Sequence, residues 1–344
     1  MRMGVRGDRV ASGVIRVALV GLGVLFCATA AWAVQYQVGD VFAGAGSGQI
    51  RHFSPAGTLI ETLNTTTGST FITGMCFDLS GNLFATNFST GTVSKFDNAG
   101  NLLAANFVTF TGTPESCVFD AAGNLYVGGP GSNVQKFSAA GALLATYLTG
   151  SSDWIDLAAD QCTLFYDGEG NIHRWDICTD SALPDFTASG TNYAIRILPN
   201  GNVLAASAGI CNQYDPSGTS IATYTASGVS LFFALNRDPD GISFWSADLG
   251  ASAGQNSIFK FAINPSAPPV LMFDGQPVTS IAGLAVFGEL VQGQPTPTPT
   301  PGGPTPTPTP PVGPAAVVPT LSGPMLAVLG VALALIALLV IRRY

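Results

Sequence analysis

The sequence has 344 residues, of which 47% are hydrophobic and only 10% are charged, and its formal net charge at pH 7 is −8. This length suits one large all-β domain or two ordinary domains. All but one of the 21 acidic residues lie between residues 34 and 292, whereas six of the 13 basic residues lie in the two end segments. An acidic central region without a basic stripe repels phosphate backbones, so we expect no nucleic-acid partner.

The first 33 residues have the layout of a secretory signal peptide. Four arginines precede an apolar run from Val17 to Ala31, and Ala31-Trp32-Ala33 forms a cleavage site with small residues at both ends. We therefore predict cleavage before Val34 and export of the chain. The alternative is an uncleaved N-terminal anchor, although the apolar run is short for a helix that spans a bilayer.

Between residues 34 and 292 one phrase recurs six times: a polar or basic residue, then an aromatic residue and, in most copies, Asp or Ser. The aromatic residues, 38 to 47 positions apart, are Phe53, Phe96, Phe137, Trp175, Tyr214 and Phe261. Around each of them, short apolar segments alternate with Gly, Asn, Asp and Ser turns, which is typical of four-stranded β units. No convincing helical period appears. The sequence therefore predicts an all-β fold, a six-bladed β-propeller with four strands per blade and the recurring aromatic residues in its core.

The first copy has three strands but no inner strand before them. The segment from Ser280 to Leu290, SIAGLAVFGEL, resembles the inner strand TFITGMCFD of the second copy. Because a propeller ring must close, we expect this last strand to complete blade one. The repeated Asp-x-x-Gly-Asn turns lack the alternating carboxylates of a calcium loop, so we interpret them as turn chemistry.

The region from Val34 to Leu290 resembles NHL-repeat and gluconolactonase-like six-bladed propellers. Such folds host lactonases, lyases and binding proteins, so the fold alone assigns no function. In the gluconolactonase-like family, the resemblance implies a divalent metal in the central channel. Glu, Asp and Asn side chains near the ends of inner strands would hold this metal, which would polarise a lactone carbonyl.

The inner strands can be aligned on four aspartates that follow them, Asp78, Asp120, Asp160 and Asp238. This alignment places at one level of the channel Thr73, Glu115, Ile155 and Phe233, with Tyr193 or a neighbour from the fifth blade. Glu115 is the only carboxylate at that level, so we expect a mixed aromatic and polar mouth without a metal or a catalytic residue. The two histidines, on third strands of different blades, form no catalytic pair. The candidate ligand-facing residues are Glu115, Asp153, Trp154, Asn192, Tyr193 and Phe233.

Export leaves five cysteines in a compartment where disulfides persist. We predict a disulfide between Cys162 and Cys178, which bracket one hairpin of the fourth blade. A turn from Asp167 to Gly170 would leave Cys178 three residues beyond the residue that faces Cys162, so the bond needs a bulge or a bend. The alternative is two buried free thiols. Cys76 and Cys117 lie on inner strands of adjacent blades, but sheets packed about 10 Å apart disfavour that bond.

A Pro/Thr-rich segment, residues 293–316, should form a stiff and extended linker. Residues 317–344 contain Val318-Pro319-Thr320-Leu321-Ser322, an uncharged apolar run up to Ile341, and a terminal arginine pair. This layout resembles the IPTL-CTERM sorting signal, a relative of the PEP-CTERM signals linked to exosortase-type processing. The resemblance implies a transmembrane helix, a location in the cell envelope or at the cell surface, and an exosortase-type processing protease as partner. A plain stop-transfer anchor is the alternative.

Together these features predict an exported, surface-tethered propeller that binds or displays an unknown extracellular ligand and needs no cofactor. The alternative is a metal-dependent, lactonase-like hydrolase with its site in the central channel, which would require a divalent cation.

Overall fold

The computed structural model describes residues 34–168, 170–187, 191–250, 256–263, 268–275 and 280–289. All of them lie in one compact unit. The predicted signal peptide (1–33), Pro/Thr-rich linker (293–316) and sorting tail (317–344) lie outside the described residues. Within the described ranges, no helix is long and apolar enough to cross a bilayer.

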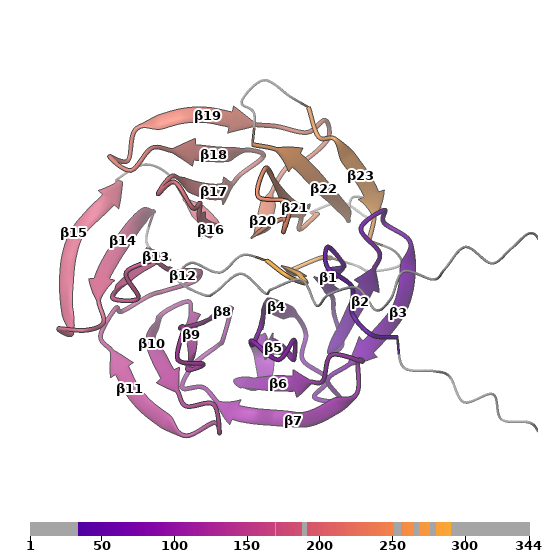
Figure 1. Ribbon diagram of the computed structural model, residues 1–344, viewed down its shortest axis with the longest axis horizontal. Coiled ribbons are helices and arrows are strands. Elements are labelled where there is room, and N and C mark those ends of the chain that lie inside the picture. The colour runs from indigo at the N-terminus through magenta and orange to yellow at the C-terminus, as the bar shows by residue number, and fades with distance from the viewer. Residues whose placement is uncertain are drawn as a thin grey trace, which may run out of the picture. The chain divides into compact units, whose positions relative to one another are not determined.

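The described residues form six four-stranded antiparallel sheets, arranged as blades around a central axis (Figure 1). This confirms the predicted six-bladed β-propeller with four strands per blade. The first three blades, from the inner to the outer strand, are β24 (Gly283–Val286), β1 (Val41–Gly44), β2 (Gln49–Phe53) and β3 (Leu59–Asn64); β4 (Ile72–Phe77), β5 (Leu83–Asn87), β6 (Thr92–Phe96) and β7 (Leu102–Thr109); and β8 (Ser116–Phe119), β9 (Leu125–Gly129), β10 (Ser132–Phe137) and β11 (Leu143–Tyr147). A short 3-10 helix, η1 (Phe88–Thr90), follows β5.

Blades four to six repeat this order. Their strands are β12 (Ile155–Leu157), β13 (Thr163–Gly168), β14 (Asn171–Asp176) and β15 (Ser181–Thr187); β16 (Asn192–Ile197), β17 (Val203–Ser207), β18 (Cys211–Tyr214) and β19 (Ser220–Tyr224); and β20 (Phe232–Arg237), β21 (Ser243–Asp248), β22 (Ser257–Ala262) and β23 (Leu271–Asp274). The recurring aromatic residues lie on the third strands. They are buried in five blades, as predicted, and Trp175 of the fourth blade is half-buried.

The ring closes in blade one, where β24 pairs antiparallel with β1, as predicted from the sequence. The residues after β24 then fix the chain end to the neighbouring blades through the carboxylate of Glu289. This carboxylate accepts hydrogen bonds from Arg196 Nε at 3.0 Å, from Asn236 Nδ2 at 2.9 Å and from the backbone N–H of Arg237 at 2.7 Å. Glu289 therefore links the end of the domain to blades five and six.

A cation–aromatic pair recurs between the second and third strands. The facing pairs are Phe42 and His52, Phe84 and Lys95, Tyr126 and Lys136, Phe165 and Arg174, and Trp245 and Lys260. In three blades the lysine also forms an ion pair with an aspartate that follows the inner strand. In blade one, the fully buried His52 replaces the lysine, with Nε2 at 2.8 Å from Asp40 Oδ2 and Nδ1 at 3.0 Å from Glu61 Oε1.

The hairpin of the fourth blade is tighter than the sequence analysis assumed. Gly168 pairs with Asn171, so Asp167 and Gly168 belong to β13, and the expected four-residue turn is wrong. The residue that faces Cys162 is consequently Ile177, which directly precedes Cys178. Cys162 and Cys178 form a disulfide, with their Cα atoms 5.2 Å apart.

A second disulfide joins Cys76 on β4 to Cys117 on β8, with a Cα–Cα distance of 5.8 Å. The expectation that adjacent blades lie too far apart for this bond is wrong, because inner strands converge toward the axis. A Cβ atom added to Gly74 would lie only 2.4 Å from the Cα of Ser116 in the next blade. The spacing of about 10 Å between stacked sheets therefore does not apply here. Cys211 is a buried free thiol.

Candidate ligand site at the channel mouth

The starts of the inner strands form one mouth of the central channel. In five blades, the residue directly after the inner strand donates its backbone N–H to the chain that returns as the second strand. These equivalent residues are Asp78, Asp120, Ala158, Leu198 and Asp238. The residues five positions earlier are Thr73, Glu115, Asp153, Tyr193 and Phe233. In the fourth blade the predicted alignment is therefore wrong, because Ala158 and not Asp160 is the equivalent residue. Asp153 takes the place assigned to Ile155, and Glu115 is not the only carboxylate at this level.

Tyr193 and Phe233 occupy β-bulges at the starts of the adjacent inner strands β16 and β20. The pairing with the second strand of each blade skips these two residues. A bulge re-aims the side chain that it carries and is often found beside functional sites. The two rings stack, with their centroids 5.7 Å apart and their planes at 29°. Both residues are half-buried, so part of this aromatic pair remains accessible.

Glu115 and Asp153 lie just before the inner strands of blades three and four. Glu115 is 5% exposed, and no described residue donates a hydrogen bond to its carboxylate. Burial, reinforced by the charge of Asp153, raises the pKa of Glu115 to about 8. Burial also raises the pKa of Asp153, although the Ser151 hydroxyl donates a hydrogen bond to Asp153 Oδ1 at 3.2 Å. Two carboxyl groups of neighbouring blades thus lie in surroundings that disfavour their charged forms.

Asp167, on the second strand of blade four, adds a third carboxyl group. Its Oδ1 accepts a hydrogen bond from the backbone N–H of Trp154, whereas its buried Oδ2 has no partner among the described residues. Burial, with the charges of Asp153 and Glu115, raises the pKa of Asp167 well above its usual range. The sequence analysis missed this residue because it took Asp-Gly as part of a turn. A two-residue hairpin turn, which also has a glycine, would have placed Asp167 in the strand.

Two of the residues predicted at the mouth are buried. Trp154 is 1% exposed and packs in the core, with the Arg196 guanidinium 5.4 Å from its ring centroid. It is therefore a core residue and not a ligand-facing one. Asn192, the first residue of β16, is only 7% exposed. Glu115, at 5% exposed, is no more accessible than Asn192, but it occupies one of the equivalent inner-strand positions. The predicted residues at these equivalent positions are Glu115, Asp153, Tyr193 and Phe233, from four consecutive blades.

The residues at the mouth do not fit the divalent metal that the gluconolactonase-like resemblance implies. Among the residues that the structure describes, no group of three or more His, Cys, Asp or Glu side chains is placed to hold a metal ion. One oxygen of Asp167 is already engaged by the backbone of Trp154. The carboxyl groups influence one another electrostatically, but their oxygens do not surround a common point as metal ligands must.

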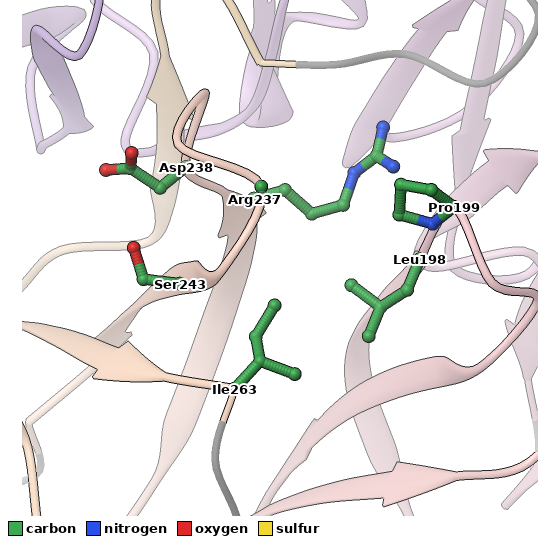
Figure 2. Close-up of a pocket in the computed structure, with 7 residues that line it drawn as sticks. Leu198, Pro199, Arg237, Asp238, Ser243 and Ile263 are labelled. Atoms are coloured by element: carbon green, nitrogen blue, oxygen red, sulfur yellow. The ribbon is translucent and has the colours of Figure 1, made fainter.

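A small pocket lies between blades five and six, at the opposite ends of the inner strands (Figure 2). Its labelled lining residues are Leu198, Pro199, Arg237, Asp238, Ser243 and Ile263. Figure 2 shows the Arg237 side chain extending toward Pro199, while the Asp238 carboxylate points the other way. Asp238 Oδ2 accepts a hydrogen bond from Trp245 Nε1 at 2.7 Å and pairs with Lys260 Nζ at 2.7 Å. This carboxylate is thus already neutralised, which leaves the channel mouth as the better candidate site.

Comparison with known proteins supports the fold and nothing finer. No protein-family model matches the chain, and no curated protein matches it. A structure of a protein of unknown function from Bacteroides caccae is similar over 74% of this chain and 100% of its own, with a TM-score of 0.58 and 14% identity. A chain from a nidogen/laminin complex is similar over 74% of this chain and 99% of its own, again with a TM-score of 0.58 and 14% identity. At this identity the likeness shows a shared fold alone.

Proposed function

We propose that this protein is an exported binding module whose ligand occupies the channel mouth. The observation that carries the proposal is Glu115, a 5% exposed residue to whose carboxyl group no described residue donates a hydrogen bond, in the same ring of residues as the stacked pair Tyr193 and Phe233. Buried polar groups in native proteins normally have a partner, and Oδ2 of Asp167, which interacts electrostatically with Glu115, has none among the described residues, which suggests an external partner. Perturbed carboxyl groups beside accessible aromatic rings are typical of ligand sites.

The fold supports a binding role, since one chain of similar fold comes from a nidogen/laminin complex. The lactonase-like alternative has less support, because no three His, Cys, Asp or Glu side chains of the described residues are placed to hold its divalent metal together. Turnover of a lactone that depends on Glu115 would favour that alternative.

Export and tethering complete the proposal and rest on the sequence alone. The signal peptide would direct the chain out of the cytoplasm, and the tail would hold it at the membrane until an exosortase-type protease processes it. The Pro/Thr-rich linker would lift the propeller off the bilayer. Deletion of residues 317–344 should release a folded propeller into the periplasm or the medium. If the shortened protein instead misfolds or stays with the membrane, the tail is not a tether.

Binding is tested with the full-length protein, purified in detergent, immobilised and exposed to fractionated extracellular material from the producing cells. Mass spectrometry then identifies the compounds that are retained. We expect compounds that bind the wild type and are lost with Tyr193→Ala combined with Phe233→Ala. The matched control is Phe71→Ala, which removes an aromatic residue of similar size that is 36% exposed outside this ring. If all three proteins retain the same compounds, the mouth is not the binding site.

A further inference from the structure

We infer that the ligand of the channel mouth carries a substituted ammonium group, whose charge is held by Glu115 and Asp153 and whose carbon substituents lie against Tyr193 and Phe233. This inference rests on the proposed binding function and assigns a chemical class to the ligand. It follows from the order of the four side chains around the channel, from their burial and from the partners that they lack.

The four residues lie on consecutive blades. Glu115 and Asp153 precede β8 and β12, while Tyr193 and Phe233 are in β16 and β20. Each of these inner strands packs against the next, so the mouth has two acidic blades followed directly by two aromatic blades. A ligand that crosses this mouth would meet carboxylates on one side and ring faces on the other.

The carboxyl groups on the acidic side have no cationic partner among the described residues. Glu115 is 5% exposed without a hydrogen-bond donor, and Asp167 is 1% exposed with Oδ2 unpartnered. Asp153 receives one hydrogen bond, from a neutral serine hydroxyl. No ion pair with a described lysine, arginine or histidine involves any of these three carboxyl groups. Burial without a cationic partner favours the neutral forms of these groups, and a bound cation would supply the partner that stabilises their charged forms.

The aromatic side selects the kind of cation. A ring face attracts a cation held within about 6 Å of its centroid, and quaternary and substituted ammonium groups are the ligands that use such rings most often. Tyr193 and Phe233 are stacked and half-buried, so their surface is both preformed and accessible.

Other ligand classes match this arrangement less well. A bare divalent metal would require oxygens gathered around one point, which the described carboxyl groups do not provide. An anion would be repelled by each of these carboxyl groups that is ionised. A neutral sugar would suit the rings and the protonated carboxyl groups, and equal binding of choline and its uncharged analogue would point to such a ligand.

The test measures choline binding to the full-length protein in detergent by titration calorimetry, beside the uncharged choline analogue in which carbon replaces nitrogen. The variants are Glu115→Gln, Asp153→Asn and Phe233→Leu, with Asp185→Asn as the control. Asp185 is a carboxylate on the outer strand β15 whose side chain is 45% exposed. Thermal melting of each variant establishes that it is folded.

We expect choline to bind at least about tenfold more tightly than its uncharged analogue. Affinity should fall by about tenfold or more in Glu115→Gln and Asp153→Asn, by about fivefold in Phe233→Leu, and not at all in Asp185→Asn. Equal binding of choline and its analogue would overturn the inference, as would unchanged affinity in folded Glu115→Gln.

Failure of this inference can be told apart from failure of the proposed function. If choline does not bind while extracellular compounds are still lost from the variant that lacks both mouth aromatics, the mouth binds another class of ligand. If neither choline nor any extracellular compound depends on the mouth residues, both proposals are wrong.

Discussion

Glu115→Gln should make the stability of this propeller less sensitive to alkaline pH. The substitution keeps the shape of the side chain but removes a carboxyl group that is 5% exposed beside a second acid, Asp153. In the wild type, the burial that excludes water from Glu115 raises its pKa from an ordinary value of 4.5 to about 8. The folded protein therefore keeps a proton that the unfolded chain releases at a lower pH.

The sign of the effect follows from proton linkage. Between the two pKa values, the folded state binds more protons than the unfolded state, so the free energy of unfolding falls as the pH rises. The contribution of Glu115 is fully present below about pH 4.5 and is lost as the pH passes about 8. At roughly 1.4 kcal/mol per pH unit, the whole shift corresponds to about 5 kcal/mol. Water that enters the open mouth will reduce this cost, so we expect about 2–3 kcal/mol.

The assay is urea unfolding of the full-length wild type and of Glu115→Gln at about pH 5 and about pH 9. The two proteins should differ by less than about 1 kcal/mol at the lower pH, and the variant should be about 2–3 kcal/mol more stable at the higher pH. The control is Asp215→Asn, because Asp215 caps an exposed turn and hydrogen bonds from Ser217 and Thr219 lower its pKa. Asp215 therefore stays charged from about pH 5 to about pH 9, and the difference between this variant and the wild type should be the same at both pH values. Parallel pH profiles for wild type and Glu115→Gln would refute the reasoning, because they would mean that Glu115 is charged without cost in the folded protein.

Three further predictions concern the scaffold. Cys76→Ser should lower the free energy of unfolding by about 3–4 kcal/mol, because the bond to Cys117 closes a loop with a sequence separation of 41. This difference in stability should vanish when wild type and variant are both measured under reducing conditions. Glu289→Ala should lower the free energy of unfolding in urea by about 3–5 kcal/mol, since it leaves the buried Arg196 without its acidic partner. A loss no larger than that caused by substituting an exposed glutamate would contradict the role of Glu289 in ring closure. His52→Ala should leave buried Asp40 with only the backbone N–H of Gln37 as a donor and destabilise the protein by a few kcal/mol. His52→Lys supplies a basic side chain as in other blades and should unfold at a temperature closer to that of the wild type. Equal melting temperatures of the two variants would count against this reasoning.

The repeat could be predicted from the sequence because it is written in residues that pack the core. One aromatic residue in each third strand must fill the space between blades, so its position tolerates little change and shows up as a period. Ring closure could be predicted for a related reason. The first copy lacks an inner strand, and a sheet with an open inner edge would leave backbone groups unpaired.

The fourth blade shows where this reasoning fails. Asp160 occurs near the position of the aspartates that follow other inner strands, but its carboxylate caps a local turn, where it accepts hydrogen bonds from the backbone N–H groups of Cys162 and Thr163. Asp120 caps a turn in the same way, through the backbone N–H groups of Ala122 and Asn124, so composition does not reveal that Asp160 lies two residues later in its blade. The resulting error of two residues assigned Ile155, and not Asp153, to the level of Glu115. The disulfide between Cys76 and Cys117 was disfavoured because a mean sheet spacing was applied to strands that converge at the axis.

The mouth residues were predicted by aligning the inner strands, and they are not part of the repeated pattern. Positions that repeat are held by packing, whereas the five equivalent positions at the mouth hold five different residues, Thr73, Glu115, Asp153, Tyr193 and Phe233. Only the threonine is fully engaged by the protein itself, through Thr86 and the carbonyl of Pro114. The other four contribute little to the stability of the scaffold. Two are carboxyl groups in surroundings that disfavour the charged form, and two are aromatic residues whose side-chain direction is changed by β-bulges. We therefore expect the departures from the repeat, and not the repeat itself, to mark the ligand site.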